Sequence, residues 1–223
     1  MPSVLRAVSL RLFLSALAAV LLLAALPCAG AWAASDTTQF AVNAGSLVFG
    51  TAPDVPNFPA LTLNGQAQTL NAQMNNYSVG DGSGSGAGWN VTVNGDGSGG
   101  KSAVFKQYCP NATCGTDTGP GYVSGGATLA ANSLSLSSSG AGFTALYGTT
   151  GTAPTHQCSS GCNVDSAAAV KTVSAASGAG IGTYQTNGYS ATSLGVSAPT
   201  TITTLLANEV YRVDLLWSLN SGP

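Results

Sequence analysis

The sequence predicts an all-β protein: an Ig-like β-sandwich, or a barrel of short strands, with long Gly/Ser-rich loops stapled by disulfides. Apolar residues recur at every second position in several short runs, and Gly, Pro and Asn separate these runs. No amphipathic helix of useful length interrupts them. With 44% hydrophobic residues, only 6% charged residues and 29 glycines, the composition is typical of an extracellular β-protein rather than of a cytosolic enzyme or a disordered chain.

Residues 1–33 are predicted to be a secretory signal peptide. Arg6 and Arg11 precede an apolar run at 12–26, and an A-x-A pair ends at Ala33, where we place the cleavage. Cuts two residues earlier or one residue later are the alternatives. An uncleaved membrane anchor is disfavoured, because the apolar run is shorter than the roughly 20 residues that a membrane span needs.

Residues 34–223 have a length that suits one domain. They hold only four basic residues against eight acidic ones. Nucleic acid is not an expected partner, because four cations cannot neutralise a run of phosphates. The same count argues against attachment to polyanions or anionic lipid by charge alone.

Four cysteines form two close pairs, in CPNATC and CSSGC, and predict the local disulfides Cys109–Cys114 and Cys158–Cys162. The two other connectivities of four cysteines remain open. A Cys₄ zinc site is the disfavoured alternative, because oxidation competes with metal binding outside the cell. We therefore expect no metal. Both pairs fall in 109–165, a Gly/Ser/Thr-rich stretch that is predicted to form long loops.

Short strands are predicted in chain order along the sequence, two of them inside 109–165. The runs are TQFAVNAG (38–45), SLVFGT (46–51), ALTLNGQAQTL (60–70), NNYSVGD (75–81), WNVTVN (89–94), AVFKQY (103–108), SLSL (133–136), FTALY (143–147) and SLGVS (193–197). In the third run, Leu61 and Leu63 precede Asn64-Gly65, a signal for a two-residue hairpin. The segment 166–177 suits either a short helix or a strand.

The segment EVYRVDLLWSLNSGP is predicted to contain a closing strand over 210–220. Its apolar face is formed by alternate residues: Tyr211, Val213, Leu215, Trp217 and Leu219. The other face carries Arg212 and Asp214, so a slip of one residue would bury both charges. Asn208 offers a turn from a preceding strand, TITTLL. The run WNVTVN repeats this pattern, with Trp89, Val91 and Val93 on one face.

These two tryptophan segments resemble the WxL domain of Gram-positive cell-surface proteins. The terminal family motif is matched at Tyr211, Leu215, Trp217, Leu219 and Pro223, with Leu216 in place of the usual Thr. The upstream motif, a Gly-rich loop that leads into a tryptophan strand, is matched at Asp81, Gly88, Trp89 and Val91. The family's frequent Arg in this loop is missing here.

The resemblance implies a WxL-type domain over 34–223 that attaches non-covalently to peptidoglycan or another cell-wall polymer of a Gram-positive bacterium. It also implies other WxL proteins and a membrane-anchored WxL-interacting protein as partners. The sequence contains no LPxTG-like sorting signal and no terminal membrane tail, and this agrees with non-covalent retention. The alternative is a structural or adhesive subunit that binds partner surface proteins by edge-strand pairing. A lectin-like adhesin that uses the loops of 109–165 is a third hypothesis.

Alternation favours tryptophans packed in the core over tryptophans stacked on sugars, which leaves binding to loops, to polar Asn, Ser and Thr side chains, or to an edge strand. Asp81 is interpreted as a turn residue. No enzyme is expected. His156, the one histidine, lies in a loop without a nucleophile motif, and the acidic residues lie in Gly, Pro or Ser turns. No cofactor is expected either, since the Gly-rich loops lack a phosphate-binding signature.

Overall fold

In the computed structural model, which describes residues 37–223, every regular element is a β-strand and every strand pairing is antiparallel. The predicted all-β class is therefore confirmed. The residues Asn43–Pro223 form one unit with its own core. The predicted signal peptide, 1–33, lies outside the described residues.

Both predicted tryptophan strands lie side by side in one sheet, here called the tryptophan sheet. Its order is β11 (Thr155–His156), β13 (Val170–Ala175), β4 (Trp89–Gly95) and β17 (Leu215–Ser221). β4 pairs with β17 over its whole length, from Gly95 opposite Leu215 to Trp89 opposite Ser221. Since β13 covers the other edge of β4, the central strand is hydrogen-bonded on both sides. The undecided segment 166–177 therefore contains a strand.

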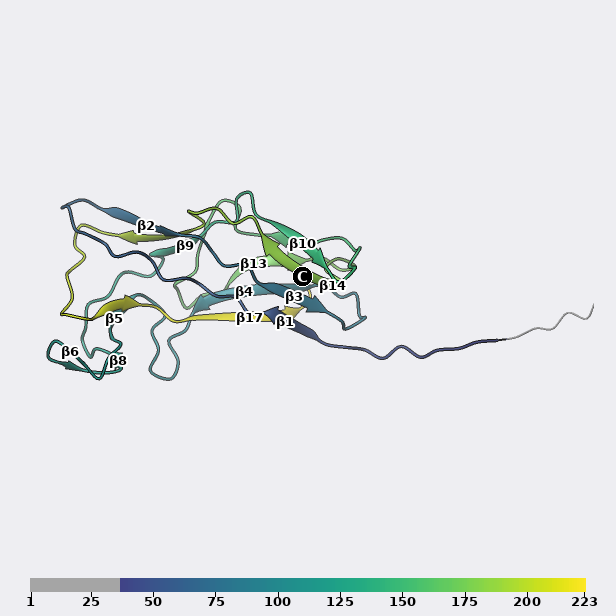
Figure 1. Ribbon diagram of the computed structural model, residues 1–223, viewed down its shortest axis with the longest axis horizontal. Coiled ribbons are helices and arrows are strands. Elements are labelled where there is room, and N and C mark those ends of the chain that lie inside the picture. Colours follow the sequence, from purple (N-terminus) through teal and green to yellow (C-terminus); the bar gives the residue numbers. More distant parts are fainter. Residues whose placement is uncertain (1–36) are drawn as a thin grey trace, which may run out of the picture. The chain divides into compact units, whose positions relative to one another are not determined.

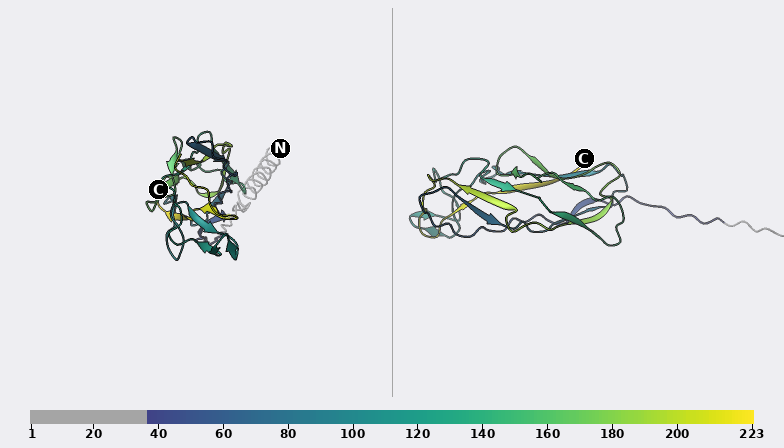
Figure 2. Two further views of the ribbon diagram at one scale, coloured as in Figure 1. Left: turned by 90° about the vertical axis from the view of Figure 1, so that its left-hand side faces the viewer. Right: turned by 90° about the horizontal axis from the view of Figure 1, so that it is seen from above.

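Two further sheets supply the other walls of the core (Figure 1). The first has the order β1 (Leu47–Thr51), β3 (Ser78–Asp81), β14 (Gly182–Asn187) and β10 (Gly142–Leu146). The second has the order β12 (Cys162–Asn163), β9 (Leu134–Leu136), β15 (Leu194–Ala198) and β2 (Gln68–Ala72). Seen from one end, the sheets surround the core (Figure 2, left).

The core is filled by the alternating apolar side chains that the sheets turn toward one another. From β4 come Trp89, Val91 and Val93, each at most 1% exposed. They pack in one cluster with residues of the opposing sheets, including Val79, Leu134, Leu136, Leu194 and Val196. Tyr77 connects the layers, with its ring centroid 5.9 Å from that of Trp217. Burial of these side chains is the main force that holds the sheets together.

The predicted terminal strand is extended, as expected, but it changes sheet partway along. β16 (Val210–Arg212) pairs with β5 (Lys106–Cys109), which pairs with β8 (Gly121–Tyr122). After Asp214 the chain joins the tryptophan sheet as β17. The alternation is correct, but Trp217 and its neighbours on that face are half-buried rather than fully enclosed.

The stretch 109–165, predicted as long loops around strand runs at 133–136 and 143–147, has its longest strands at those two runs. It contains β9 and β10, and Leu134 and Leu136 of β9 are core residues. The ribbon β6 (Thr113–Cys114) and β7 (Asp117–Thr118) is also part of it. The structure has both disulfides in the local pairing, Cys109–Cys114 and Cys158–Cys162.

Three predicted strands do not form. Phe40 and Val42 lie in an extended segment without strand pairing, 90% and 82% exposed. Asn64-Gly65 does make a turn, with Gly65 at φ +78°, but 61–63 forms no strand, so there is no hairpin. The run 201–206 is irregular too, although Asn208 forms the predicted turn at φ +70°. Each of these segments lacks a strand to pair with, and period two alone does not supply one.

Candidate functional site

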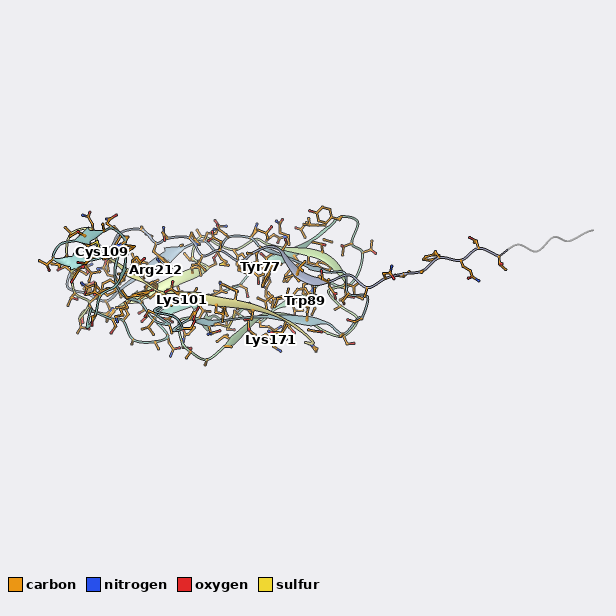
Figure 3. The ribbon with its side chains drawn as sticks, turned by 90° about the horizontal axis from the view of Figure 1, so that it is seen from below. Tyr77, Trp89, Lys101, Cys109, Lys171 and Arg212 are labelled. Carbon is orange, nitrogen blue, oxygen red and sulfur yellow. A yellow bond between two sulfur atoms is a disulfide. The ribbon has the colours of Figure 1, made fainter. Side chains whose placement is uncertain are left out.

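The two indole side chains face the interior. Trp89 is 1% exposed, and its Nε1–H donates a hydrogen bond to the carbonyl of Gly180 at 3.0 Å. The close approach requires glycine, since a Cβ at position 180 would lie 2.6 Å from that nitrogen. Trp217 packs against the core beside Tyr77. Trp89 and Tyr77 are marked within the body in Figure 3. Trp89 therefore offers no free face on which a sugar could stack, and Trp217 is half-buried.

The strand pairing brings the upstream and terminal motifs together. Leu219 lies opposite Val91, and the N–H of Gly222 donates to the carbonyl of Gly88 at 2.9 Å. Pro223 follows directly and is exposed. Gly88 has φ +78°, a conformation that favours glycine, and it allows the loop to enter β4 against Ala175 and Ala176. Most motif residues thus form one structural unit.

Asp81 and Tyr211 lie apart from that unit. Asp81 ends β3 and is 5% exposed. Its carboxylate accepts hydrogen bonds from the N–H and the hydroxyl of Ser83, at 3.0 and 2.6 Å, which is the geometry of a turn residue. Tyr211 is in β16, where its hydroxyl donates to the carbonyl of Thr203 at 3.1 Å.

The outer side of the tryptophan sheet carries an uncharged polar surface, here called the polar face. Its polar members are alternate side chains of the two tryptophan strands: Asn90, Thr92, Asn94, Ser218 and Asn220. The exposed Leu216, opposite Asn94, lies on the same side. Thr92 lies opposite Ser218, and Asn90 lies opposite Asn220. The Asn220 amide donates to the Asn90 side chain at 3.2 Å, so these groups hold one another in place. Lys171 of β13, opposite Thr92, borders this surface.

At the other end of the body is a cleft of about 900 Å³. Its walls come from β2, β15, β5 and β16, and the segment 52–63 runs along it. The lining is mainly apolar and aromatic, and includes Phe58, Leu70, Tyr108, Val196, Tyr211 and Leu215. Two residues of the terminal motif, Tyr211 and Leu215, therefore line this cleft. A large apolar concavity with a few polar groups is the usual form of a binding site.

A polar network supports the wall of the cleft. The carboxylate of Asp214 accepts hydrogen bonds from the Tyr122 hydroxyl at 2.6 Å and from Arg212 at 2.8 Å. Burial raises the pKa of Asp214, but these two hydrogen bonds, a third from the Ser102 N–H and the charge of Arg212 together place the pKa below its ordinary value. The guanidinium of Arg212 also lies 4.5 Å from the ring centroid of Tyr108. Arg212 and Cys109 are both marked toward this end in Figure 3.

His156 is held among aromatic rings. Its ring stacks on Phe143 at 4.4 Å between centroids, and its Nε2–H donates to the carbonyl of Gly142 at 3.3 Å. Burial lowers the pKa of His156, because the charged imidazolium loses solvation. The other nitrogen, Nδ1, is buried without a hydrogen-bond partner in the described structure. This arrangement is that of a packed neutral histidine.

The described part of the chain contains no group of three or more His, Cys, Asp or Glu placed to hold a metal ion. In residues 37–223 no helix has the length and apolar character to cross a bilayer. The chain matches no protein-family model, and it has no match among curated proteins or solved structures.

Sequence reasoning did not find the cleft. Its lining comes from segments far apart in the chain, around residues 58, 70, 108, 196 and 211. One signal was present: the prolines Pro53, Pro56 and Pro59 recur at every third residue beside an apolar run. That spacing is typical of an extended segment that cannot pair as a regular strand.

Proposed function

We propose that the protein is an exported surface protein that attaches non-covalently to peptidoglycan or another polymer of a bacterial cell wall, with the polar face as its contact surface. The observation that supports this is the pairing of the two tryptophan strands. Their apolar sides close the core, and their outer sides carry amide and hydroxyl groups without charge, interrupted by the exposed Leu216. The WxL-like motifs therefore create this surface even though their tryptophans do not face solvent.

The polar face suits an extended polar ligand for geometric reasons. Neighbouring strands lie about 4.8 Å apart, and alternate residues on one strand lie roughly 6.6 Å apart, so the amide and hydroxyl groups form a fixed grid. Hydroxyl and amide groups of a glycan strand or a stem peptide can donate to and accept from such a grid. Because Asn90, Thr92 and Ser218 are held by a sheet, little conformational entropy is lost on binding.

Attachment of this kind is expected to resist salt. The polar face has no ionised group of its own, and electrostatic contacts are the ones that salt screens. From the resemblance to WxL proteins, we also propose other WxL proteins and a membrane-anchored WxL-interacting protein as partners. The proposed location is the cell wall of a Gram-positive bacterium.

The test uses residues 34–223, which include the whole body, sedimented with purified peptidoglycan sacculi. The double variant Thr92→Ala/Asn220→Ala removes one hydroxyl and one amide from the polar face. Its matched control is Thr69→Ala/Asn71→Ala, which removes the same two groups from exposed positions of β2. We expect the first variant to bind about tenfold more weakly, since two polar contacts are lost, and the control to bind as the wild type does.

Binding must also survive moderate salt and be released by denaturant. Release by moderate salt alone would contradict attachment through the uncharged face. Equal losses in both double variants, or no loss in either, would show that the polar face is not the contact surface. Unfolding curves of the two variants report whether each retains the wild-type fold.

A further inference from the structure

The segment that runs along the cleft is not part of any sheet. In the described chain, residues 52–63 make no backbone-to-backbone hydrogen bond, and they contain Pro53, Pro56 and Pro59. Their hydrogen bonds to neighbouring segments of the same chain involve side chains. The side chain of Asn75 donates to Asp54 at 2.7 Å, and the side chain of Gln68 donates to the carbonyl of Thr62 at 3.1 Å. This segment, here called the strap, covers the core as an extended chain without strand pairing.

The strap leaves a strand edge without a partner. β2 is the last strand of its sheet and pairs with β15 alone in the described structure. Leu70 of β2 lines the cleft, together with Val196 of β15. A strand edge beside an apolar cleft is the arrangement by which an added strand is recognised, with main-chain bonds at the edge and alternate side chains in the pockets.

The chain itself carries a segment with the matching properties. Residues 38–44, TQFAVNA, are extended, uncharged and outside any strand. Phe40 and Val42 are on the same side by alternation and are 90% and 82% exposed. Exposure of two large apolar side chains on one side of a segment does not stabilise the protein, and such exposure usually marks an interaction site. The absence of charge fits a mainly apolar cleft.

We propose that residues 38–44 of one copy bind as an added strand in the cleft of a second copy, along the free edge of β2, with Phe40 and Val42 in the cleft. The partner is therefore another molecule of this same chain. The occupying strand supplies the main-chain donors and acceptors that the strap, with its prolines, does not offer to β2.

This contact does not close on itself. β1, which follows the proposed strand, and β5, which borders the cleft, lie toward opposite ends of the body Asn43–Pro223 (Figure 1; Figure 2, right). A contact between two different surfaces leaves one strand and one cleft unused when a single contact joins two copies. It therefore predicts open chains of copies rather than a closed dimer. The proposal does not depend on wall attachment, because the polar face is a different surface.

The experiment combines two variants of residues 34–223 whose defects are complementary. In the first, Phe40→Asp/Val42→Asp, the strand is disabled and the cleft is intact. In the second, Leu63→Arg/Val210→Arg, the cleft is blocked at two lining residues that are 44% and 46% exposed, and the strand is intact. Phe40 and Val42 are largely exposed and Leu63 and Val210 are nearly half exposed, so both variants are expected to unfold close to the wild-type temperature.

Molar mass is measured by light scattering after size exclusion over a hundredfold range of concentration. We expect the wild type to form oligomers that grow with concentration and each variant alone to remain monomeric. A mixture of the two variants is expected to give a heterodimer and nothing larger, because one strand and one cleft remain between them.

A synthetic peptide of residues 36–46 provides the second measurement. It is expected to bind the Phe40→Asp/Val42→Asp protein, and at least tenfold more weakly to the protein with the blocked cleft. A wild type that is monomeric at every concentration overturns the proposal. Oligomers that persist in either variant, or a mixture that stays monomeric, overturn it as well, since assembly would then be absent or would use another surface. None of these outcomes affects sedimentation with peptidoglycan, which tests the polar face separately.

Discussion

The tryptophan sheet and the cleft end contain similar apolar residues, but only the tryptophan sheet closes around them. In the sheet, β4 is paired on both edges and its inward side chains are almost completely buried. At the cleft, the strap has no strand pairing, and lining residues such as Leu63 and Val210 remain nearly half exposed. Apolar burial alone does not distinguish the two regions. The difference is whether the backbone has a partner. The paired tryptophan sheet therefore forms the more rigid region, and the cleft end retains a free strand edge to which another strand can add.

Removal of one aromatic ring from each region should give the largest difference in the free energy of unfolding. Trp89→Ala removes a fully buried indole and its hydrogen bond to Gly180, so the free energy of unfolding should fall by about 3–5 kcal/mol. Phe58→Ala removes a half-buried ring from the strap and should cost about 1 kcal/mol. Denaturant unfolding measures both. Equal losses would mean that the strap belongs to the core, and the comparison would fail.

A pair of glycines sharpens the comparison, because both have φ +78°. At Gly88 an added Cβ would lie 2.8 Å from the carbonyl carbon of Ala176, whereas at Gly65, beside the strap, nothing lies within 4 Å. Gly65→Ala should therefore cost only the backbone strain, about 1 kcal/mol. Gly88→Ala adds a clash with the tryptophan sheet and should cost about 3 kcal/mol. Melting temperatures of the two variants test the order, and a larger loss at Gly65 would reverse our assignment of the rigid region.

The sequence predicts the tryptophan half of the fold well for a physical reason. In the β4 segment, period-two alternation assigns each side chain to the core or to solvent, and a register slip would bury polar groups. The same rule predicts strands at 61–63 and 201–206, where none forms. Alternation describes one side of a strand, whereas a strand also needs neighbours, and these come from distant segments such as β15 for β2. The two disulfides were accessible from spacing, because each closes a short loop.

The candidate sites follow the same division. The polar face could be anticipated, because Asn90, Thr92 and Asn94 alternate with the core residues of one strand. The cleft could not, because its lining combines the strap with β5, β15 and β16. Asp214 was identified only as a charge on the outer face. Its contacts with Tyr122 and Ser102 depend on the change of sheet at the junction of β16 and β17, which no local pattern announces.

Two carboxylates that are each next in the chain to a cleft-lining residue provide a third comparison. Asp214→Asn keeps the shape of the side chain but places an NH₂ group against hydrogen-bond donors of Tyr122, Ser102 or Arg212. The free energy of unfolding should fall by about 2 kcal/mol. Asp54→Asn, on the exposed strap, should change stability by less than about 0.5 kcal/mol.

The pKa of Asp214 is lowered in the folded state, so its contribution to stability is present above the ordinary carboxyl pKa and is lost as pH falls through the folded pKa. Unfolding free energies at pH 6 and at pH 3 measure this. The wild type should lose more stability than Asp214→Asn between these values, and identical losses would exclude Asp214 as the acid-sensitive group.

The smallest expected effect concerns His156, which joins β11 to the Phe143 ring of β10. Burial lowers its pKa in the folded state, so the unfolded chain binds the proton more readily. The stabilising contribution of neutral His156 is therefore complete above the ordinary pKa of histidine and is lost as pH falls from there toward the folded pKa. Since the chain has one histidine, His156→Gln should flatten the stability profile between pH 7.5 and pH 5.5, by about 1 kcal/mol or less.

On acidification, Asp117 changes the stability of the folded state in the direction opposite to that of His156, and it therefore serves as an internal check on the assignment to His156. Its hydrogen bond with Glu209, and then its burial, raise its pKa, so protonation of Asp117 stabilises the folded state as pH falls. A wild-type profile that loses stability on acidification through this range therefore reports His156 and not this carboxyl. If His156→Gln keeps the full slope, the histidine is already solvated in the native state. The packing between β10 and β11 would then resemble the loosely covered cleft more than the closed tryptophan sheet.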